Sequence, residues 1–197
     1  MNKNIIFIGG GGHSLVCAEI VNQHQDYKLV GFIDKNNNAI LSESGYIYLG
    51  DDKILRDVIK KNSYFFITIG QIKNPSKRIE MFEKILSWGG EFPVLMSNNC
   101  YISPSAQIGK GTIIMNGSVV NAKSIVGENC IINSNALIEH EVIIESHVHI
   151  APSAIILGKV VIKYGSFIGA GAIIREGVII EKNSIIAAGE KVMFNKF

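Results

Sequence analysis

The chain has 197 residues, of which 47% are hydrophobic, 19 are lysine or arginine and 17 are aspartate or glutamate. This length and apolar content suffice for one large or two small packed domains, which excludes an intrinsically disordered protein. Positive and negative charges nearly cancel, and no cluster of lysine and arginine forms a stripe that would neutralise nucleic-acid phosphates. We therefore expect no nucleic-acid partner.

The cysteines and the first apolar run indicate where the protein works. Cys17, Cys100 and Cys130 are odd in number and lack the spacing of a disulfide framework or a thiolate metal site, which favours a reducing compartment. The apolar run at residues 5–8 ends at glycines, so it is too short for a signal peptide or a membrane span. The sequence therefore predicts a soluble, cytoplasmic protein with no metal and no membrane partner.

Strand-like apolar runs alternate with helix-like stretches through the first half of the chain. We expect, in chain order, a strand at 5–8, a helix at 15–23, a strand at 29–33, a helix at 54–60, a strand at 64–69, a helix at 76–88 and a strand at 92–95. This alternation predicts an α/β domain with a parallel sheet, about half the size of a full dinucleotide-binding fold.

A different period begins at residue 102, where an isoleucine or valine recurs at every sixth position without interruption. The positions are Ile102, Ile108, Ile114, Val120, Val126, Ile132, Ile138, Ile144, Ile150, Ile156, Ile162, Ile168, Ile174, Ile180, Ile186 and Val192. This period is typical of a parallel β-helix, in which each unit is a short strand and a turn and the recurring residues stack inside a prism. With three units to a coil, we expect about five coils.

Together these features resemble the NeuD/PglD family of hexapeptide-repeat sugar acetyltransferases. The resemblance rests on IIFIGGGGHS at residues 5–14, VGFIDK at 30–35, FITIG at 66–70 and NSNALIEHEVIIESHVHIAPSA at 133–154, and it covers nearly the whole chain. It implies a Rossmann-like domain over residues 1–97 and a left-handed β-helix over residues 98–197. The general handedness of parallel crossovers would instead favour a right-handed coil.

The resemblance also implies a function. Family members transfer the acetyl group of acetyl-CoA to a nucleotide-linked amino sugar, here of the UDP-4-amino-4,6-dideoxy-N-acetylhexosamine type. They act as homotrimers, with acetyl-CoA between neighbouring β-helices and the nucleotide on the Rossmann-like domain. Many relatives end in a segment resembling VxGxPAK, whereas this chain ends GEKVMFNKF, which leaves the contacts of that segment with CoA open.

Acetyl transfer from a thioester needs a base for the acceptor's proton. His140 lies at the third place of its hexapeptide, where side chains reach the turn and the outer surface. The position alone fits an exposed turn histidine, whereas the resemblance of IEHE implies the base. Glu141 is expected to stabilise the imidazolium, although Glu139 is equally close in sequence, and Asn133 is either an orienting group near the base or an ordinary turn residue.

The expected acetyl-CoA contacts follow from the resemblance and from the 18-residue coil. His149 is expected to contact acetyl-CoA from the wall of the groove. Gly158 stacks one coil above His140, where the resemblance places a backbone N–H donor to the thioester carbonyl. Ala170 and Ala188 are expected to contact the pantetheine arm through main chain, and both also fit small residues that pack between coils.

The glycines at residues 9–12 follow a strand and precede a helix expected to begin near Ser14, a geometry that receives phosphate. Asp34, about 20 residues after the glycines, is placed for a ribose or base contact. By resemblance, the pyrophosphate is lined by Gly11, Gly12 and His13. Gly70 would let the end of the third strand approach the same ligand, unless it is an ordinary strand-ending glycine.

Several alternatives remain open. Nothing in the pattern separates an amine acceptor from a hydroxyl of a sialic-acid-like sugar, or UDP from GDP or CMP. A non-catalytic trimeric module that binds nucleotide sugars has the same features. An NAD oxidoreductase would need a second domain that supplies the hydride acceptor site, and this sequence shows none. A zinc hydratase of the γ-carbonic-anhydrase type would need a different ligand spacing from that of His140, His147 and His149, and we expect His147 at a surface turn.

Overall fold

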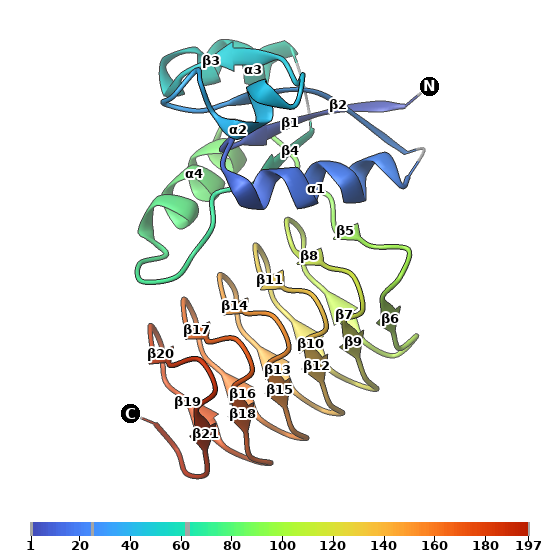
Figure 1. Cartoon of the computed structure of the whole chain (residues 1–197), viewed down its shortest axis with the longest axis vertical. Helices are drawn as coiled ribbons and strands as arrows, with labels where there is room; N and C mark the ends of the chain where they lie inside the picture. The colour runs from blue at the N-terminus through green and yellow to red at the C-terminus, as the bar shows by residue number, and fades with distance from the viewer. Residues whose placement is uncertain (1, 25, 62–63, 197) are drawn as a thin grey trace. The chain divides into compact units, whose positions relative to one another are not determined.

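The computed structural model describes residues 2–24, 26–61 and 64–196 (Figure 1). Its contacts divide the chain into two compact units, one of Met1–Gly70 with Ser76–Pro93 and one of Gln71–Pro75 with Val94–Phe197. The short segment Gln71–Pro75 thus belongs to the second unit although it lies between two parts of the first. Among the described residues, no helix has the length and apolar character needed to cross a membrane.

The first unit is built on a parallel sheet of four strands in the order β3-β2-β1-β4. Its elements are β1 (Lys3–Ile8), α1 (Gly12–Asn22), β2 (Tyr27–Ile33), α2 (Ile40–Glu43), β3 (Tyr48–Gly50), a 3-10 turn (Asp52–Ile54), α3 (Leu55–Lys61), β4 (Tyr64–Ile67) and α4 (Ser76–Ser87). The central strand β1 is apolar without alternation because it has a neighbour on both sides and is covered on both faces. The predicted α/β order is confirmed, and β3 is an additional short edge strand.

The strand expected at residues 92–95 is wrong. Phe92 packs in the core of the α/β unit beside Phe82, and Pro93 has no N–H to donate to a ladder. One residue later the chain enters β5 (Leu95–Met96), which pairs in parallel with β8 of the second unit. The apolar run at residues 92–95 is therefore divided: Phe92 packs in the α/β unit, and Leu95 is part of the β-helix. The first strand of the β-helix thus begins before residue 102.

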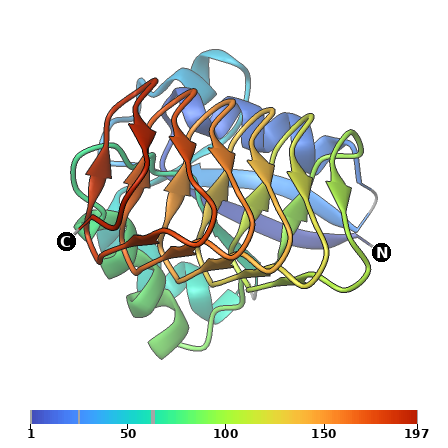
Figure 2. The same ribbon diagram turned by 90° about the horizontal axis from the view of Figure 1, so that it is seen from below.

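The second unit is a parallel β-helix whose two-residue strands form three faces, which we name after a central strand of each (Figure 2). The β13 face holds β7 (Gln107–Ile108), β10 (Ile125–Val126), β13 (Ile143–Ile144), β16 (Val161–Ile162) and β19 (Ile179–Ile180). The β14 face holds β5, β8 (Ile113–Ile114), β11 (Ile131–Ile132), β14 (His149–Ile150), β17 (Phe167–Ile168) and β20 (Ile185–Ile186). The β12 face holds β6 (Tyr101–Ile102), β9 (Val119–Val120), β12 (Leu137–Ile138), β15 (Ile155–Ile156), β18 (Ile173–Ile174) and β21 (Lys191–Val192).

The recurring isoleucines and valines lie where the period predicts. Each is the second residue of its strand, and those from Ile114 to Val192 are buried in one cluster. Each pairs with the residue 18 positions away, as Ile132 does with Ile114 and Ile150. The β12 and β14 faces are six strands deep and the β13 face is five, so the helix is slightly longer than five coils, and β5 adds one strand that the period from residue 102 did not include.

The turns of the β-helix share one backbone conformation. Every sixth residue from Gly111 to Gly189 has a φ between 53° and 72°. Eight of these residues are not glycine, and Glu141, His147 and Lys159 are among them. The left-handed conformation costs such residues about 1–2 kcal/mol each, so the strand ladders on both sides must hold it. The direction of each turn side chain is therefore set by the coil.

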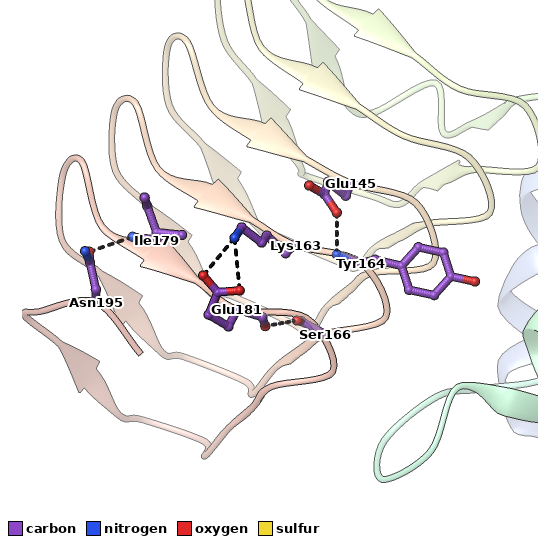
Figure 3. Close-up of polar contacts among 7 residues, drawn as sticks. All are labelled: Glu145, Lys163, Tyr164, Ser166, Ile179, Glu181 and Asn195. Atoms are coloured by element: carbon purple, nitrogen blue, oxygen red, sulfur yellow. Dashed lines mark hydrogen bonds and ion pairs between the residues drawn. The ribbon is translucent and has the colours of Figure 1, made fainter. Parts of the chain in front are cut away.

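The C-terminal segment covers the open edge of the last strand on the β13 face (Figure 3). The Asn195 Oδ1 accepts a hydrogen bond of 2.9 Å from the Ile179 amide, and the Lys196 amide donates to the Ile179 carbonyl at 3.1 Å. One coil back, Lys163 Nζ lies 2.7 Å and 3.0 Å from the two carboxylate oxygens of Glu181. The segment thus ends the solenoid by pairing backbone groups that would otherwise form an exposed edge.

Candidate active site

His140 and Glu141 occupy the turn between β12 and β13, at the corner where the β12 face meets the β13 face. The His140 Nδ1 lies 3.1 Å from a carboxylate oxygen of Glu141, and the two side chains are 51% and 48% exposed. The structure thus pairs His140 with Glu141, the neighbour favoured over Glu139. A carboxylate accepts only, so this contact places a proton on Nδ1 and leaves the lone pair on Nε2. Nε2 can then act as a base.

Gly158 lies one coil beyond His140, against the imidazole ring. A Cβ at residue 158 would stand 2.7 Å from His140 Cε1 and 2.8 Å from Nε2. These separations are too short for any side chain, so glycine is required here by space. The Lys159 amide donates to the His140 carbonyl at 3.0 Å, which fixes the two coils in this register. The predicted stacking of residues 140 and 158 is therefore present, while the N–H role of Gly158 stays a prediction.

Ala170 and Ala188 lie at a different corner, where the β14 face meets the β12 face. Both are exposed, and the Gly189 amide donates to the Ala170 carbonyl at 2.8 Å. The β12 face lies between this corner and the corner of His140 and Gly158. Gly158 thus borders the β12 face on one side and Ala170 and Ala188 border it on the other, and their contacts with CoA stay predictions.

His149 lies on the β14 face and is only 8% exposed. Its Nδ1 lies 2.5 Å from the backbone carbonyl oxygen of Gln71, and its Nε2 lies 3.2 Å from the side-chain nitrogen Nδ2 of Asn133. The Phe167 ring packs edge-on against it at 5.2 Å between centroids. A hydrogen bond from His149 to acetyl-CoA would have to share or replace one of these bonds. The predicted contact with acetyl-CoA would therefore be made by a ring whose two nitrogens already have partners.

His147 departs from the expected surface turn. It is in a turn, but it is 5% exposed, with Asn129 Nδ2 at 2.9 Å from its Nδ1 and the Tyr164 ring at 4.9 Å. The period could not show this burial, because it comes from the side chains of neighbouring coils. Within the described ranges, no three His, Cys, Asp or Glu side chains lie close enough to hold a metal ion.

A pocket of about 210 Å³ opens at the carboxyl ends of β1, β2 and β4. Ligands of open parallel sheets bind at this edge, where the chain leaves the central strands in opposite directions. The pocket is lined by Ile8, Gly9, Ile33, Asp34, Lys35, Asp52, Ile69 and Lys77. Of the residues expected to bind the nucleotide, only Asp34 is in this lining. Gly11, Gly12, His13 and Gly70 lie in the adjoining loops and not on the pocket wall.

Asp34 holds the glycine loop. Its Oδ2 accepts a hydrogen bond of 2.7 Å from the Gly10 amide, and its Oδ1 accepts one of 2.9 Å from the Asn36 amide. Gly11 and Gly12 are exposed, and a Cβ at either would meet nothing within 4 Å. Helix α1 begins at Gly12, earlier than the start expected near Ser14. The loop is thus open toward solvent and fixed from behind by one carboxylate.

Lys77 on the pocket wall and His13 in the first turn of α1 make further side-chain contacts. Lys77 Nζ lies 3.0 Å from Asp52, and although burial opposes its charge, the carboxylates of Asp52 and Glu80 raise the pKa of Lys77. Sequence reasoning missed the contact of Lys77 with Asp52, because the two residues are 25 positions apart and no motif links them. His13 sits beside Cys17, whose thiol has a pKa raised to about 12 by complete burial.

Comparison with known proteins bears on both units. Residues 4–85 match the PglD N-terminal domain, and residues 159–190 match the hexapeptide repeat of succinyl-transferase. The α/β unit therefore matches a PglD N-terminal domain and the second unit carries hexapeptide repeats, as the resemblance implied. The predicted α/β plus left-handed β-helix architecture is thereby confirmed.

Several PglD-like proteins can be compared in detail. UDP-N-acetylbacillosamine N-acetyltransferase of Bacillus subtilis is 32% identical over 115 residues, which are 57% of this chain and 51% of the relative. The chain thus spans about half the length of this curated relative. The acetyltransferase domain of PglB from Neisseria gonorrhoeae, with a TM-score of 0.89, is 27% identical over 98% of this chain and 93% of the other. PerB from Caulobacter crescentus, a complex with CoA and GDP-perosamine, has a TM-score of 0.86 and is 26% identical over 98% and 89%.

Proposed function

We propose that this chain transfers the acetyl group of acetyl-CoA to the amino group of a nucleotide-linked 4-amino sugar. The observation that carries the proposal is the contact of His140 with Glu141 at an exposed corner, with Gly158 beneath the ring. The similar PerB structure holds CoA and GDP-perosamine, and the PglB domain has been solved with acetyl-CoA. These complexes support acetyl-CoA as co-substrate and a nucleotide sugar as acceptor.

His140 is the general base of the proposed reaction. Its Nε2 accepts a proton as the sugar amine attacks the thioester carbonyl, and Glu141 at Nδ1 stabilises the imidazolium that forms. When the tetrahedral intermediate collapses, the C–S bond breaks and His140 returns the proton to the sulfur. The products are CoA with a free thiol and the N-acetylated sugar. The backbone N–H of Gly158 is proposed to donate to the carbonyl oxygen as negative charge develops there.

The α/β unit is proposed to bind the nucleotide. The exposed glycine loop and the first turn of α1 present backbone N–H groups, which suit a pyrophosphate. Lys35 adds positive charge to the pocket wall, whereas Lys77 is paired there with Asp52. Asp34 lies at the end of β2, the usual place for a ribose contact. Gly11, Gly12, His13 and Gly70 are proposed to complete this site.

The working assembly is proposed to be a homotrimer. Two faces of the β-helix carry outward rows of aliphatic residues that are only partly buried in one chain. They are Val119, Leu137, Ile155 and Ile173 on the β12 face, and Ile125, Ile143, Val161 and Ile179 on the β13 face. Such apolar rows are typical of subunit interfaces, and they border the corner that bears His140. Light scattering that found a stable, active monomer would contradict this assembly.

We further propose that the protein works in the cytoplasm. Cys17, Cys100 and Cys130 form no disulfide in the structure, as is usual in a reducing compartment. Nucleotide sugars and acetyl-CoA as joint substrates agree with this location. Immunoblotting of cytoplasmic and membrane fractions of the cells would test this location, and we expect the protein in the cytoplasmic fraction.

A coupled thiol-release assay over UDP- and GDP-linked 4-amino sugars and free sialic acids tests the proposed function. We expect CoA release that depends on a nucleotide-linked amino sugar. Turnover with a sialic acid alone would instead indicate an O-acetyltransferase. Stabilisation by nucleotide sugars and acetyl-CoA without thiol release would indicate a binding module.

A further inference from the structure

A buried glutamine fastens the segment Gln71–Pro75 to the β-helix. Gln71 is 2% exposed, and its Nε2 donates to the carbonyl oxygens of His147 at 3.0 Å, Gly165 at 3.2 Å and Ser166 at 3.3 Å. His147 belongs to one coil, and Gly165 and Ser166 belong to the next. One side-chain amide thus holds this segment, which we call the strap, against two successive coils.

The backbone of the same residue determines where the proton of His149 resides. The Gln71 carbonyl oxygen lies 2.5 Å from His149 Nδ1. A carbonyl oxygen only accepts hydrogen bonds, so Nδ1 must carry the proton. Nε2 of the neutral ring is then an acceptor, and the Asn133 amide nitrogen lies 3.2 Å from it. The Asn133 Oδ1 accepts from the Ser134 amide at 2.8 Å, which turns the NH₂ group toward His149.

These contacts form a chain with one consistent direction. Gln71 fixes His149, His149 accepts from Asn133, and Asn133 accepts from the backbone of the turn at Ser134. A second proton on the ring would place an N–H of His149 against the NH₂ group of Asn133, which is a donor facing a donor. The arrangement therefore favours a neutral ring, and it orients the side-chain amide of the partly buried Asn133.

We propose that Gln71 is a positioning residue that fixes His149 as the neutral tautomer protonated at Nδ1 and, through it, orients the Asn133 amide. His149 then acts as a rigid part of the cofactor wall and not as a second base. The catalytic consequence rests on the proposed function, since it concerns acetyl-CoA, whereas the tautomer does not. Every contact in this chain lies within the second unit of the structure.

The tautomer can be measured in the unmodified protein. Correlation of ¹⁵N and ¹H signals in the imidazole rings distinguishes a protonated Nδ1 from a protonated Nε2, and comparison with His149→Asn assigns the signal. We expect His149 to carry its proton on Nδ1 without ligand at neutral pH. A ring protonated at Nε2, or at both nitrogens, would overturn the proposal whether or not the protein turns out to be an acetyltransferase.

Substitution of Gln71 adds a test of the consequence. Gln71→Met keeps the length of the side chain and removes its donor, and Gln23→Met, at an exposed position of the α/β unit, is the matched control. We expect Gln71→Met to mix the His149 tautomers and to raise the acetyl-CoA KM about tenfold, the effect of losing one buried hydrogen bond. The nucleotide-sugar KM should change less than about twofold, since the α/β unit is untouched. An unchanged His149 spectrum and acetyl-CoA KM in folded Gln71→Met would contradict the positioning role.

Discussion

The two units hold their candidate site residues in different ways. In the β-helix, backbone ladders fix the corner on both sides of the pair, since the Glu141 amide donates to the Ala122 carbonyl at 2.9 Å and the His140 carbonyl accepts from Lys159 at 3.0 Å. In the α/β unit, the Asp34 side chain holds the glycine loop through the Gly10 amide. Removing the side chain of His140 or Glu141 should therefore lower the rate of the reaction without altering the backbone around it. Removing the side chain of Asp34 should instead change the conformation of the glycine loop.

The largest expected effect is the loss of the base. His140→Ala should lower kcat by about 10²–10⁴-fold with little change in either KM, the usual range for a positioned general base. The fold should persist because the side chain is half exposed and the coil is held by its backbone. Steady-state thiol release measures the change, with His24→Ala in the α/β unit as control. A variant that retains most of its kcat would show that the base lies elsewhere, and His149 would be tested next.

Crowding the same ring should have the next largest effect. Gly158→Val would place carbon atoms inside the space of the His140 imidazole, which must then turn away from its present position. Misplacing a catalytic group by about 1 Å can cost roughly 10²-fold in rate, so we expect a fall in kcat of that order. Kinetics together with the melting temperature separate this effect from unfolding. A fully active Gly158→Val would mean that His140 need not lie where the structure places it.

Asp34 tests the other side of the comparison. Asp34→Ala removes the acceptor for the Gly10 and Asn36 amides, and we expect the KM of the nucleotide sugar to rise about tenfold, as for a lost hydrogen bond to a charged group. The acetyl-CoA KM should stay nearly constant. Gly11→Val should act in the same direction without loss of stability, because its Cβ enters open space. An equal rise of both KM values would show that the α/β unit also binds the CoA substrate.

The smallest effect is expected at the carboxylate beside the base. Glu141→Gln keeps the size of the side chain and removes the charge that stabilises the imidazolium, so kcat should fall by less than about tenfold. Glu139→Gln is the matched control, because it alters the other neighbour of His140 by the same change. Equal losses in the two variants would remove the special role of Glu141.

The sequence predicted most of the β-helix because each position of a six-residue period has one structural meaning. The residues at 138 and 156 had to be buried, and residue 158 had to stack on residue 140. The same period could not show the burial of His147 or the strap at Gln71, because both depend on contacts that no local pattern encodes. In the α/β unit, alternation located the main elements, but β3 was too short to recognise and Pro93 divided one apolar run between two cores.

The candidate site was predictable to a similar degree. IEHE identified His140 with Glu141, and the spacing identified Gly158, because the corner is periodic. The pocket at the carboxyl ends of β1, β2 and β4 was only half foreseen, since Asp52 and Lys77 come together from different elements of the α/β unit. An ion pair between residues far apart in the sequence cannot be predicted from the local sequence pattern around either residue.

Transfer of ¹³C-labelled acetyl groups, followed by NMR, tests the central claim most directly. The protein would be incubated with carbonyl-labelled acetyl-CoA and a nucleotide-linked 4-amino sugar. We predict a new amide carbonyl signal on the sugar that grows with wild-type protein and stays undetected with His140→Ala over the same interval. An ester carbonyl signal, labelled acetate without acetylated sugar, or an equal amide signal from His140→Ala would contradict amine acetylation with His140 as its base.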